Sequence, residues 1–412
     1  MKCGLLGRTL RYSFSPEIHA FYGDYEYRLF EVEPEELSDF IRSGEWDGLN
    51  VTIPYKRDVI PFCGTLTTTA REIGSVNTIV RLPDGSLLGD NTDYFGFRHL
   101  LSTNRMDACG KKAVVLGDGG ASLTVRCALS DAGAREAVAG ATEGPCAFAY
   151  IYDHLDAEIV VNTTPVGTYP DVEGTLPFDL VRFTHCSGVV DLTYNPLRTN
   201  LLLSAKSLGI PYAGGLTMLT AQAFRSSELF TGSKLDEALI GRATETITQK
   251  MRNIVLVGMP GSGKSTIAQE LSRRLGREAV DTDSLVEAAS GTSIPDIFAR
   301  EGETAFRKRE EAAVREVSAL RGAIVSVGGG AVLSGTNRDA LMRTGVIVHL
   351  TRELDKLSTD GRPLSAGADA LMAMEKARAP IYEGTADITV AIREDDVPAT
   401  VDAVIEGLYA HA

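Results

Sequence analysis

The stretch NIVLVGMPGSGKS, residues 253–265, decides the fold of the C-terminal part of the chain. Its apolar beginning predicts a buried strand, and the sequence TIAQELSRRLG that follows it predicts a helix. Between them, the pattern G-x-x-x-x-G-K-S predicts a glycine-rich loop whose backbone N–H groups point at phosphate oxygens, with Lys264 on the β- and γ-phosphates and the Ser265 hydroxyl on Mg²⁺. The sequence therefore predicts a parallel α/β domain that binds a nucleoside triphosphate through Gly258, Gly261, Ser262, Gly263, Lys264, Ser265 and Thr266.

The composition is that of a globular protein with more than one domain. A chain of 412 residues exceeds the usual span of one hydrophobic core, so two or three domains are expected. The net charge of -14 argues against nucleic acid or an anionic membrane as a partner, because phosphate-rich surfaces would be repelled. Any bound anion is therefore expected to meet locally placed Arg, Lys and backbone N–H groups.

We find no sequence signal for membrane insertion or secretion. No apolar run approaches the roughly 18 residues that a membrane span needs, and Arg8 soon interrupts the apolar N-terminal stretch. All six cysteines lie between Cys3 and Cys186, and none forms a CxxC pair. We expect a cytoplasmic protein with reduced, structural cysteines.

Strand-like runs alternate with helical patterns along most of the chain, which predicts layers of α/β structure. Several short strands precede residue 105, and the run AVVL at 113–116 opens a second group. The helical pattern from 215 to 250 ends in the polar segment GRATETITQKMRN, which we interpret as a linker. The predicted domains are 1–105 together with 215–245, 106–214, and 251–412.

Several groups of residues behind the phosphate loop indicate the acceptor. AVDTD places Asp281 and Asp283 at the end of a second strand, where residues two apart face the same side, so one carboxylate can hold Mg²⁺ and the other a polyol. The segments GETAFRKREE, DGRPLSAG and ARAPIY supply Arg307, Arg362 and Arg378. Each feature alone is also typical of a helix cap or a solvated ion pair. The segment VSVGGGAV adds Gly328, Gly329 and Gly330. Glycines have no side chain that could keep a ligand away from their backbone N–H groups.

Together and in this order, these motifs resemble shikimate kinase over residues 251–395. The resemblance implies a P-loop domain like that of the nucleoside-monophosphate kinases, with MgATP as phosphate donor, Asp281 on Mg²⁺, and Asp283 and the three glycines on shikimate. It also implies that Arg307 and Arg378 clamp the substrate carboxylate, which two planar guanidinium groups suit. Arg362 would stabilise the transferring phosphoryl group. It begins the motif RPLS of the lid, and the lid segment that follows is short. A gluconate-type kinase with the same loop is the alternative.

In the front half, SFSP and NVTIPYK place two serines, then a Thr and a Lys beside a proline turn, which can line a pocket for a hydroxylated acid. GSVNT and GDNTDYFGF add an Asn and an Asp. A lysine and an aspartate form a workable proton-transfer pair, since one can pass a proton to a carbonyl oxygen during reduction. Each residue alone also fits a structural role, because Asn-Thr-Asp is a common turn.

Together these strings resemble shikimate dehydrogenase from Gly4 to about Leu239. The resemblance implies a catalytic pair, Lys56 and Asp93. It also implies that DLTYNPLRT contributes to the site, and that the chain crosses back to its first domain at GGLTMLTAQA, after the nucleotide domain. The substrate domain would thus be discontinuous. The substrate-binding residues that the resemblance implies are Ser13 and Ser15 for the carboxylate, Thr52 and Asn77 for ring hydroxyls, and also Tyr194 and Gln222.

The expected coenzyme site departs from the family pattern. Gly117, Gly119, Gly120 and Ala121 lie between a strand and a helix, as a Rossmann-like dinucleotide site requires, but Ser122 replaces the third glycine of the motif. The family's arginine for the 2′-phosphate of NADP is missing, and no Lys or Arg occurs from 136 to 181. Glu143 could accept a hydrogen bond from a ribose 2′-OH, which would favour NAD, so NADP and NAD both stay open.

The segment after Thr142 is also too short for the family's extra helix and strand, so this domain is predicted to be trimmed. The sequence thus predicts a bifunctional enzyme that reduces 3-dehydroshikimate to shikimate and then phosphorylates shikimate. Two alternatives for the front half are a non-catalytic shikimate-binding regulator of the kinase and a dehydrogenase of quinate.

Overall fold

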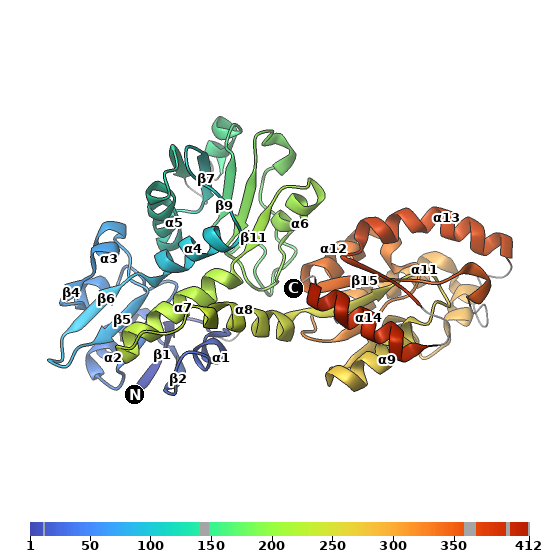
Figure 1. The fold of residues 1–412 in the computed structure, drawn as a ribbon, viewed down its shortest axis with the longest axis horizontal. Helices are drawn as coiled ribbons and strands as arrows, with labels where there is room; N and C mark the ends of the chain where they lie inside the picture. Colours follow the sequence, from blue (N-terminus) through green and yellow to red (C-terminus); the bar gives the residue numbers. More distant parts are fainter. Residues whose placement is uncertain (11–12, 141–147, 358–367, 393–395, 411–412) are drawn as a thin grey trace. The chain divides into compact units, whose positions relative to one another are not determined.

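The computed structural model describes residues 1–10, 13–140, 148–357, 368–392 and 396–410. The chain divides into two compact units, Met1–Ile247 and Thr248–Ala412. Figure 1 shows the α/β build of each unit, which confirms the predicted fold class. The division falls inside helix α8 (Ala238–Met251), so the polar segment interpreted as a linker is mostly helical. None of the helices described has the length and apolar character that crossing a membrane requires.

The first sheet of the front unit is mixed and has the strand order β2-β1-β3-β5-β6-β4. Strand β5 runs antiparallel to both β3 and β6, and the other neighbours are parallel. Its strands are β1 (Lys2–Gly7), β2 (Glu26–Glu31), β3 (Gly48–Val51), β4 (Thr65–Leu66), β5 (Thr78–Arg81) and β6 (Leu87–Asp90). The helices of this part are α1 (Ser15–His19), α2 (Leu37–Ser43), α3 (Thr68–Ile73) and α4 (Thr92–Thr103).

The second sheet of the front unit is parallel and has the order β11-β10-β9-β7-β8. Among the strands described, none pairs with the outer edge of β8, and only the 3-10 helix η3 (Ala149–His154) precedes β9. The strands are β7 (Lys112–Leu116), β8 (Glu136–Gly140), β9 (Ile159–Asn162), β10 (Gly188–Asp191) and β11 (Tyr212–Gly214), with helices α5 (Gly120–Asp131) and α6 (Asn200–Ser207).

Helix α7 (Leu216–Thr231) follows the second sheet but also packs on the first part of the chain. The Tyr22 hydroxyl donates to the Thr220 carbonyl at 3.0 Å, and the Ser227 hydroxyl lies 3.1 Å from Nδ1 of His19. Its other side reaches the second sheet, because Met218 shares a core with Phe97 of α4 and with β7, β9 and β10. Helix α7 therefore carries Gln222 to a position between the two sheets.

The rear unit has one parallel sheet in the order β13-β14-β12-β15-β16. Apolar residues of its central strands are fully buried between helices on both faces. The strands are β12 (Asn253–Val257), β13 (Ala279–Asp281), β14 (Ile324–Ser326), β15 (Gly345–Thr351) and β16 (Ile388–Ala391). The helices are α9 (Lys264–Leu275), α10 (Thr282–Ser290), α11 (Ile294–Ser318), α12 (Gly335–Thr344), α13 (Ala368–Thr385) and α14 (Val397–Ala410).

Candidate functional sites

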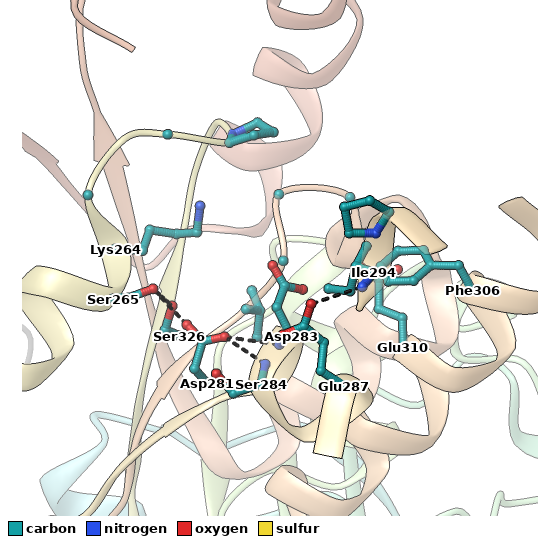
Figure 2. A pocket seen from close by; sticks show the side chains of 18 of the residues that line it. Lys264, Ser265, Asp281, Asp283, Ser284, Glu287, Ile294, Phe306, Glu310 and Ser326 are labelled. Carbon is teal, nitrogen blue, oxygen red and sulfur yellow. Dashed lines mark hydrogen bonds between the residues drawn. The ribbon is translucent and has the colours of Figure 1, made fainter. Parts of the chain in front are cut away.

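The rear unit contains a cleft of about 610 Å³ at the carboxyl ends of its strands. The segments that follow β12, β13, β14 and β15 all reach this edge, because the carboxyl ends of neighbouring parallel strands meet there. Figure 2 shows side chains of the phosphate loop, α10 and α11 facing the same space. The predicted residues that line it are Gly261, Gly263, Lys264, Ser265, Thr266, Asp281, Asp283, Arg307, Gly328, Gly329, Gly330 and Arg378.

The phosphate loop has the backbone that its glycines were expected to provide. Gly258, Gly261 and Gly263 have φ of 147°, 81° and 94°, a region that other residues rarely adopt. The Lys264 ammonium lies over the loop, 3.1 Å from the carbonyl oxygen of Gly258. The Ser262 hydroxyl is buried and has no hydrogen-bond partner among the described residues. No side chain caps the N-terminus of α9 at Gly263, so its backbone N–H groups suit the phosphates of a nucleotide.

Two oxygen groups next to the loop fit Mg²⁺. The Ser265 hydroxyl donates to Oδ2 of Asp281 at 2.7 Å and lies 3.4 Å from the Ser326 hydroxyl. Hydroxyl and carboxylate oxygens are the ligands that Mg²⁺ prefers. The other carboxylate oxygen of Asp281 accepts from the backbone N–H of Asp283 at 3.0 Å, so Asp281 also caps α10.

The expected placement of Asp283 on a strand is wrong. Asp283 lies in the first turn of α10, because the strand ends at Asp281 and the helix starts at Thr282. Its carboxylate nonetheless faces the glycines after β14, since a Cβ at Gly328 would come within 2.6 Å of Oδ1 of Asp283. The helix turn, and not strand alternation, brings this carboxylate into the cleft (Figure 2).

The arginines of the cleft are anchored by a buried carboxylate and by backbone. Nη1 of Arg307 donates to Oε2 of Glu310 at 2.7 Å, and the Glu310 side chain is 2% exposed. Burial raises the pKa of Glu310, and the charge of Arg307 partly offsets this effect. Nη1 of Arg378 donates to the Gly329 carbonyl at 3.2 Å, and this oxygen also accepts from the Tyr382 hydroxyl. Arg307 and Arg378 thus bring two anchored guanidinium groups to the cleft.

Some residues of the rear cleft had not been predicted as site residues. Glu310 lies three residues after Arg307 and four after Phe306 in α11, so helical spacing could have indicated Glu310 as a neighbour of Arg307. Arg352 follows β15 and also lines the cleft. Its position depends on the pairing of β15 with β12, which no local motif announces. The predicted lid residue Arg362 lies outside the described residues.

The front unit contains a second cleft, of about 260 Å³, between its two sheets. All of the residues predicted to bind substrate or catalyse line it together: Ser13, Ser15, Thr52, Lys56, Asn77, Asp93, Tyr194 and Gln222. They come from segments as far apart as α1 and α7. Ala121 of the glycine-rich turn lines the same cleft, so the dinucleotide turn and this cleft are contiguous.

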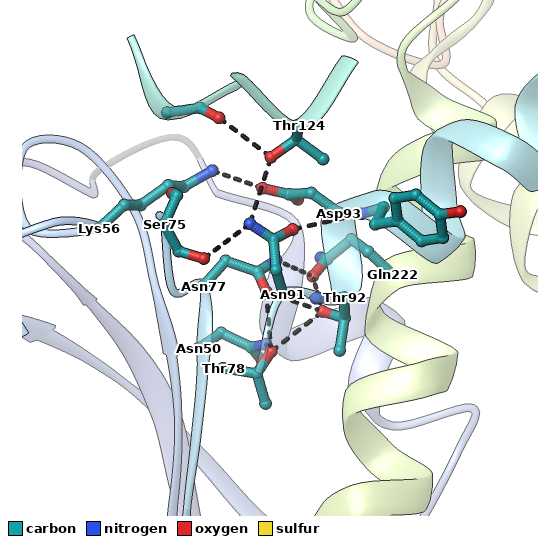
Figure 3. A network of polar contacts seen from close by, with 12 residues as sticks. Asn50, Lys56, Ser75, Asn77, Thr78, Asn91, Thr92, Asp93, Thr124 and Gln222 are labelled. Carbon is teal, nitrogen blue, oxygen red and sulfur yellow. Dashed lines mark hydrogen bonds and ion pairs between the residues drawn. The ribbon is translucent and has the colours of Figure 1, made fainter. Parts of the chain in front are cut away.

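Lys56 and Asp93 form a direct ion pair in this cleft. Nζ of Lys56 lies 2.6 Å from Oδ2 of Asp93, and the two side chains are 17% and 11% exposed. Figure 3 shows the lysine reaching across to the start of α4, where Asp93 lies in the first turn. A largely buried pair of this kind can deliver a proton to a nearby oxygen.

A buried amide network lies beside the pair (Figure 3). Oδ1 of Asn77 accepts from the backbone N–H of Thr92 at 2.6 Å, and its Nδ2 donates to Oε1 of Gln222 at 3.4 Å. Nδ2 of Asn50 donates to the Thr78 hydroxyl at 3.2 Å, and this hydroxyl donates to Asn77. Asn50 lines the cleft and was missed, although it is the first residue of the NVTIPYK segment.

The glycine-rich turn fits a dinucleotide. Gly117 has φ of 127°, and a Cβ there would overlap the Thr163 hydroxyl. No heavy atom of the described residues lies within 4 Å of the place that a Cβ on Gly119 would take, and Gly119 begins α5 without a side-chain cap. The N-terminus of α5 is therefore open to a diphosphate. Glu143, the residue considered for the ribose, lies outside the described residues.

Comparisons with known proteins assign both units. The family model described as shikimate kinase matches residues 260–409, and the model of the shikimate dehydrogenase substrate binding domain matches residues 5–79. A shikimate dehydrogenase (NADP(+)) from Clostridium beijerinckii is 36% identical over 255 residues, which are 57% of this chain and 94% of that protein.

Solved structures of shikimate dehydrogenases also match this chain. Shikimate dehydrogenase 1 from Peptoclostridium difficile has a TM-score of 0.55 at 31% identity, covering 60% of this chain and 98% of that one. A chorismate mutase/shikimate 5-dehydrogenase fusion protein from Clostridium acetobutylicum has a TM-score of 0.55 at 34% identity, covering 60% and 96%. The chain therefore belongs to the shikimate dehydrogenase family, carries a shikimate kinase domain behind the dehydrogenase, and is a bifunctional enzyme of the shikimate pathway.

Proposed function

We propose that the front site reduces 3-dehydroshikimate to shikimate with NAD(P)H, and that the rear site phosphorylates the 3-hydroxyl of shikimate with MgATP. One observation supports both halves of the proposal. Each cleft combines groups that bind a carboxylate with a group that can act on a ring oxygen: serines with Lys56 in front, arginines with Asp283 behind. The same cyclohexene acid would satisfy both sets.

In the front site, Lys56 donates a proton to the carbonyl oxygen of the substrate. Asp93, at 2.6 Å, holds the ammonium group in place and keeps it oriented towards that oxygen. The reduced nicotinamide, when bound, supplies the hydride that the carbonyl carbon receives. Ser13 and Ser15, whose hydroxyls lie 3.1 Å apart, donate to the carboxylate. Asn77 and Gln222, ordered by their own hydrogen bond, hold the ring hydroxyls.

In the rear site, Arg307 and Arg378 bind the shikimate carboxylate bidentately, since guanidinium and carboxylate are both planar. Asp283, which faces Gly328, holds the hydroxyl that receives the phosphoryl group. Lys264 and the N–H groups of the loop bind the phosphates of ATP, and Ser265 and Asp281 bind Mg²⁺. Arg362 is proposed to stabilise the transferring group.

The coenzyme of the front site is proposed to be a nicotinamide dinucleotide bound at Gly117, Gly119, Gly120 and Ala121. The relative from Clostridium beijerinckii is named for NADP(+). This chain has no Lys or Arg from 136 to 181 to pair with a 2′-phosphate. We therefore propose that this site does not prefer NADP(H): it binds NAD(H) with an affinity equal to or higher than its affinity for NADP(H).

The test is an absorbance assay at 340 nm with shikimate and either NAD⁺ or NADP⁺, run beside an ADP-release assay with shikimate and MgATP. Turnover in both assays is the expected result. The short crossover after β8 favours a second candidate, a front half that binds shikimate without turnover and regulates the kinase. No reduction of either coenzyme, together with calorimetric binding of shikimate to the front site, would favour this candidate. Turnover of quinate above that of shikimate would instead identify a quinate dehydrogenase.

A further inference from the structure

Arg352 lies beside the phosphate loop because of the strand order of the rear sheet. Strands β12 and β15 are parallel neighbours, and Val257 at the end of β12 pairs with His349. The phosphate loop and the segment after β15 therefore leave the sheet side by side. A Cβ at Gly258 would overlap the carbonyl oxygen of Leu350, which shows how closely the two segments run. Arg352, two residues beyond Leu350, is thereby fixed at the edge of the loop.

The Arg352 guanidinium is close to the last glycine of the loop. Its Nη1 lies 3.9 Å from the place that a Cβ on Gly263 would take. Gly263 is the N-cap of α9, a helix that no side chain caps at this end. Arg352 lines the same cleft as Gly261, Lys264 and Ser265. The guanidinium thus lies beside the last glycine of the phosphate loop.

This placement has an electrostatic consequence. The N-terminus of a helix carries a partial positive charge, and a guanidinium beside it adds to the positive potential that attracts an anion. Lys264 already places one ammonium group over the loop. Of the other two arginines that line the cleft, Arg307 pairs with Glu310 and Arg378 donates to the Gly329 carbonyl. Arg352 adds positive charge on the side of the nucleotide.

We propose that Arg352 is a nucleotide-binding residue that donates hydrogen bonds to the phosphate chain of ATP, opposite the N–H groups of the loop. Its planar fork can bridge oxygens of two phosphates, which a lysine does less well. This inference rests on the proposed kinase function and adds a phosphate contact to it. It assigns Arg352 to the phosphates and not to the adenine ring.

The test is isothermal titration calorimetry of the full chain with Mg–ADP, inorganic tripolyphosphate and adenosine, for the wild type, Arg352→Ala and Arg352→Lys. Loss of a charge-assisted contact predicts an affinity for ADP and tripolyphosphate that is about 10-fold or more weaker in Arg352→Ala. Arg352→Lys should recover part of it, and adenosine binding should not change. In the ADP-release assay, the KM for ATP should rise while the KM for shikimate stays the same.

Arg273→Ala is the matched control, since Arg273 is an exposed arginine at the other end of α9 and pairs with Glu270. Unchanged affinity for ADP in Arg352→Ala would overturn the proposal. An equal loss for adenosine would overturn it too, because it would place Arg352 on the base. If the wild type binds ADP but does not phosphorylate shikimate, the proposed kinase function fails while the phosphate contact of Arg352 is still measured.

Discussion

Lys56 and Asp93 of the front unit form an ion pair, with 2.6 Å between Nζ of Lys56 and Oδ2 of Asp93. The two residues belong to different segments, the loop after β3 and the first turn of α4. Oδ2 of Asp93 and the amide network of Asn77 meet at the same end of α4. One helix N-terminus therefore positions both the proposed proton donor, Lys56, and the amide network proposed to hold the substrate.

Replacing Lys56 by Ala should lower the kcat of shikimate oxidation by about 10²–10⁴-fold, because it removes the proton-transfer group. Asp93→Asn should lower it as well, since the amide no longer offers the ammonium a charged partner. The rate is followed at 340 nm. Shikimate phosphorylation by the same variants is the internal control and should keep its wild-type rate. A variant without Lys56 that retained full dehydrogenase turnover would refute the assigned role.

Arg378→Ala should raise the KM of the kinase for shikimate, because one fork of the carboxylate clamp is removed. Arg378 is only 9% exposed, so its contact with a carboxylate is largely desolvated, and the loss should be about 1.5–3 kcal/mol, or roughly 10- to 100-fold. ADP release at varied shikimate measures it. Arg378→Lys keeps the charge but not the planar fork and should be intermediate. A KM equal to that of the wild type in Arg378→Ala would favour another acceptor, such as a gluconate-type sugar acid.

How far the sequence predicted the molecule depends on the range of the interaction. The strand, loop and helix at 253–275 follow from local spacing and are present as expected. The contact between Asn77 and Gln222 joins residues 145 positions apart. Asn77 and Gln222 could both be named as site residues from a family resemblance. The spacing of residues along the sequence, however, does not predict that the two side chains are in contact. Asp283 was placed on a strand because the end of β13, two residues earlier than assumed, depends on the cap that Asp281 provides.

Asn50 and Arg352 were missed for the same physical reason. Each reaches its cleft through the pairing of parallel strands, β1 with β3 and β12 with β15. Strand order is a property of the whole sheet, and the residues of one strand do not reveal its neighbours. The trimming of the second sheet stays a prediction, which rests on the number of residues between β8 and β9.

Ser75→Ala should not destabilise the front unit: we expect its free energy of unfolding to equal that of the wild type or to exceed it by up to about 1 kcal/mol. Ser75 is 0% exposed, and its hydroxyl has no hydrogen-bond partner among the described residues. Removing an unsatisfied buried hydroxyl costs no hydrogen bond. Thr78→Val is the contrasting variant, because the Thr78 hydroxyl bonds Asn50, Asn77 and Thr92, and we expect it to be destabilising. A Ser75→Ala protein clearly less stable than the wild type would show that this hydroxyl has a partner.

Unfolding of the front unit can be followed by itself, because Trp46 is the single tryptophan of the chain and lies buried in the core of the first sheet. His19 lies in the same unit, 1% exposed, stacked on Tyr27 at 3.9 Å between ring centroids. Nδ1 of His19 lies 2.6 Å from the Tyr25 hydroxyl. Burial lowers the pKa of His19 from 6.5 to about 3, since the charged imidazolium would be desolvated.

This shift predicts how stability depends on pH. Below pH 6.5 the unfolded chain binds a proton at His19 that the folded chain does not bind until about pH 3. The stability contributed by neutral His19 is therefore complete above pH 6.5 and is lost as the pH falls towards 3, by about 1.4 kcal/mol per pH unit. Urea unfolding monitored by Trp46 fluorescence between pH 7 and pH 4.5 measures this slope. In His19→Gln, which cannot take up a proton, the slope should be smaller by about that amount. Equal slopes for the two proteins would mean that His19 is protonated in the folded state.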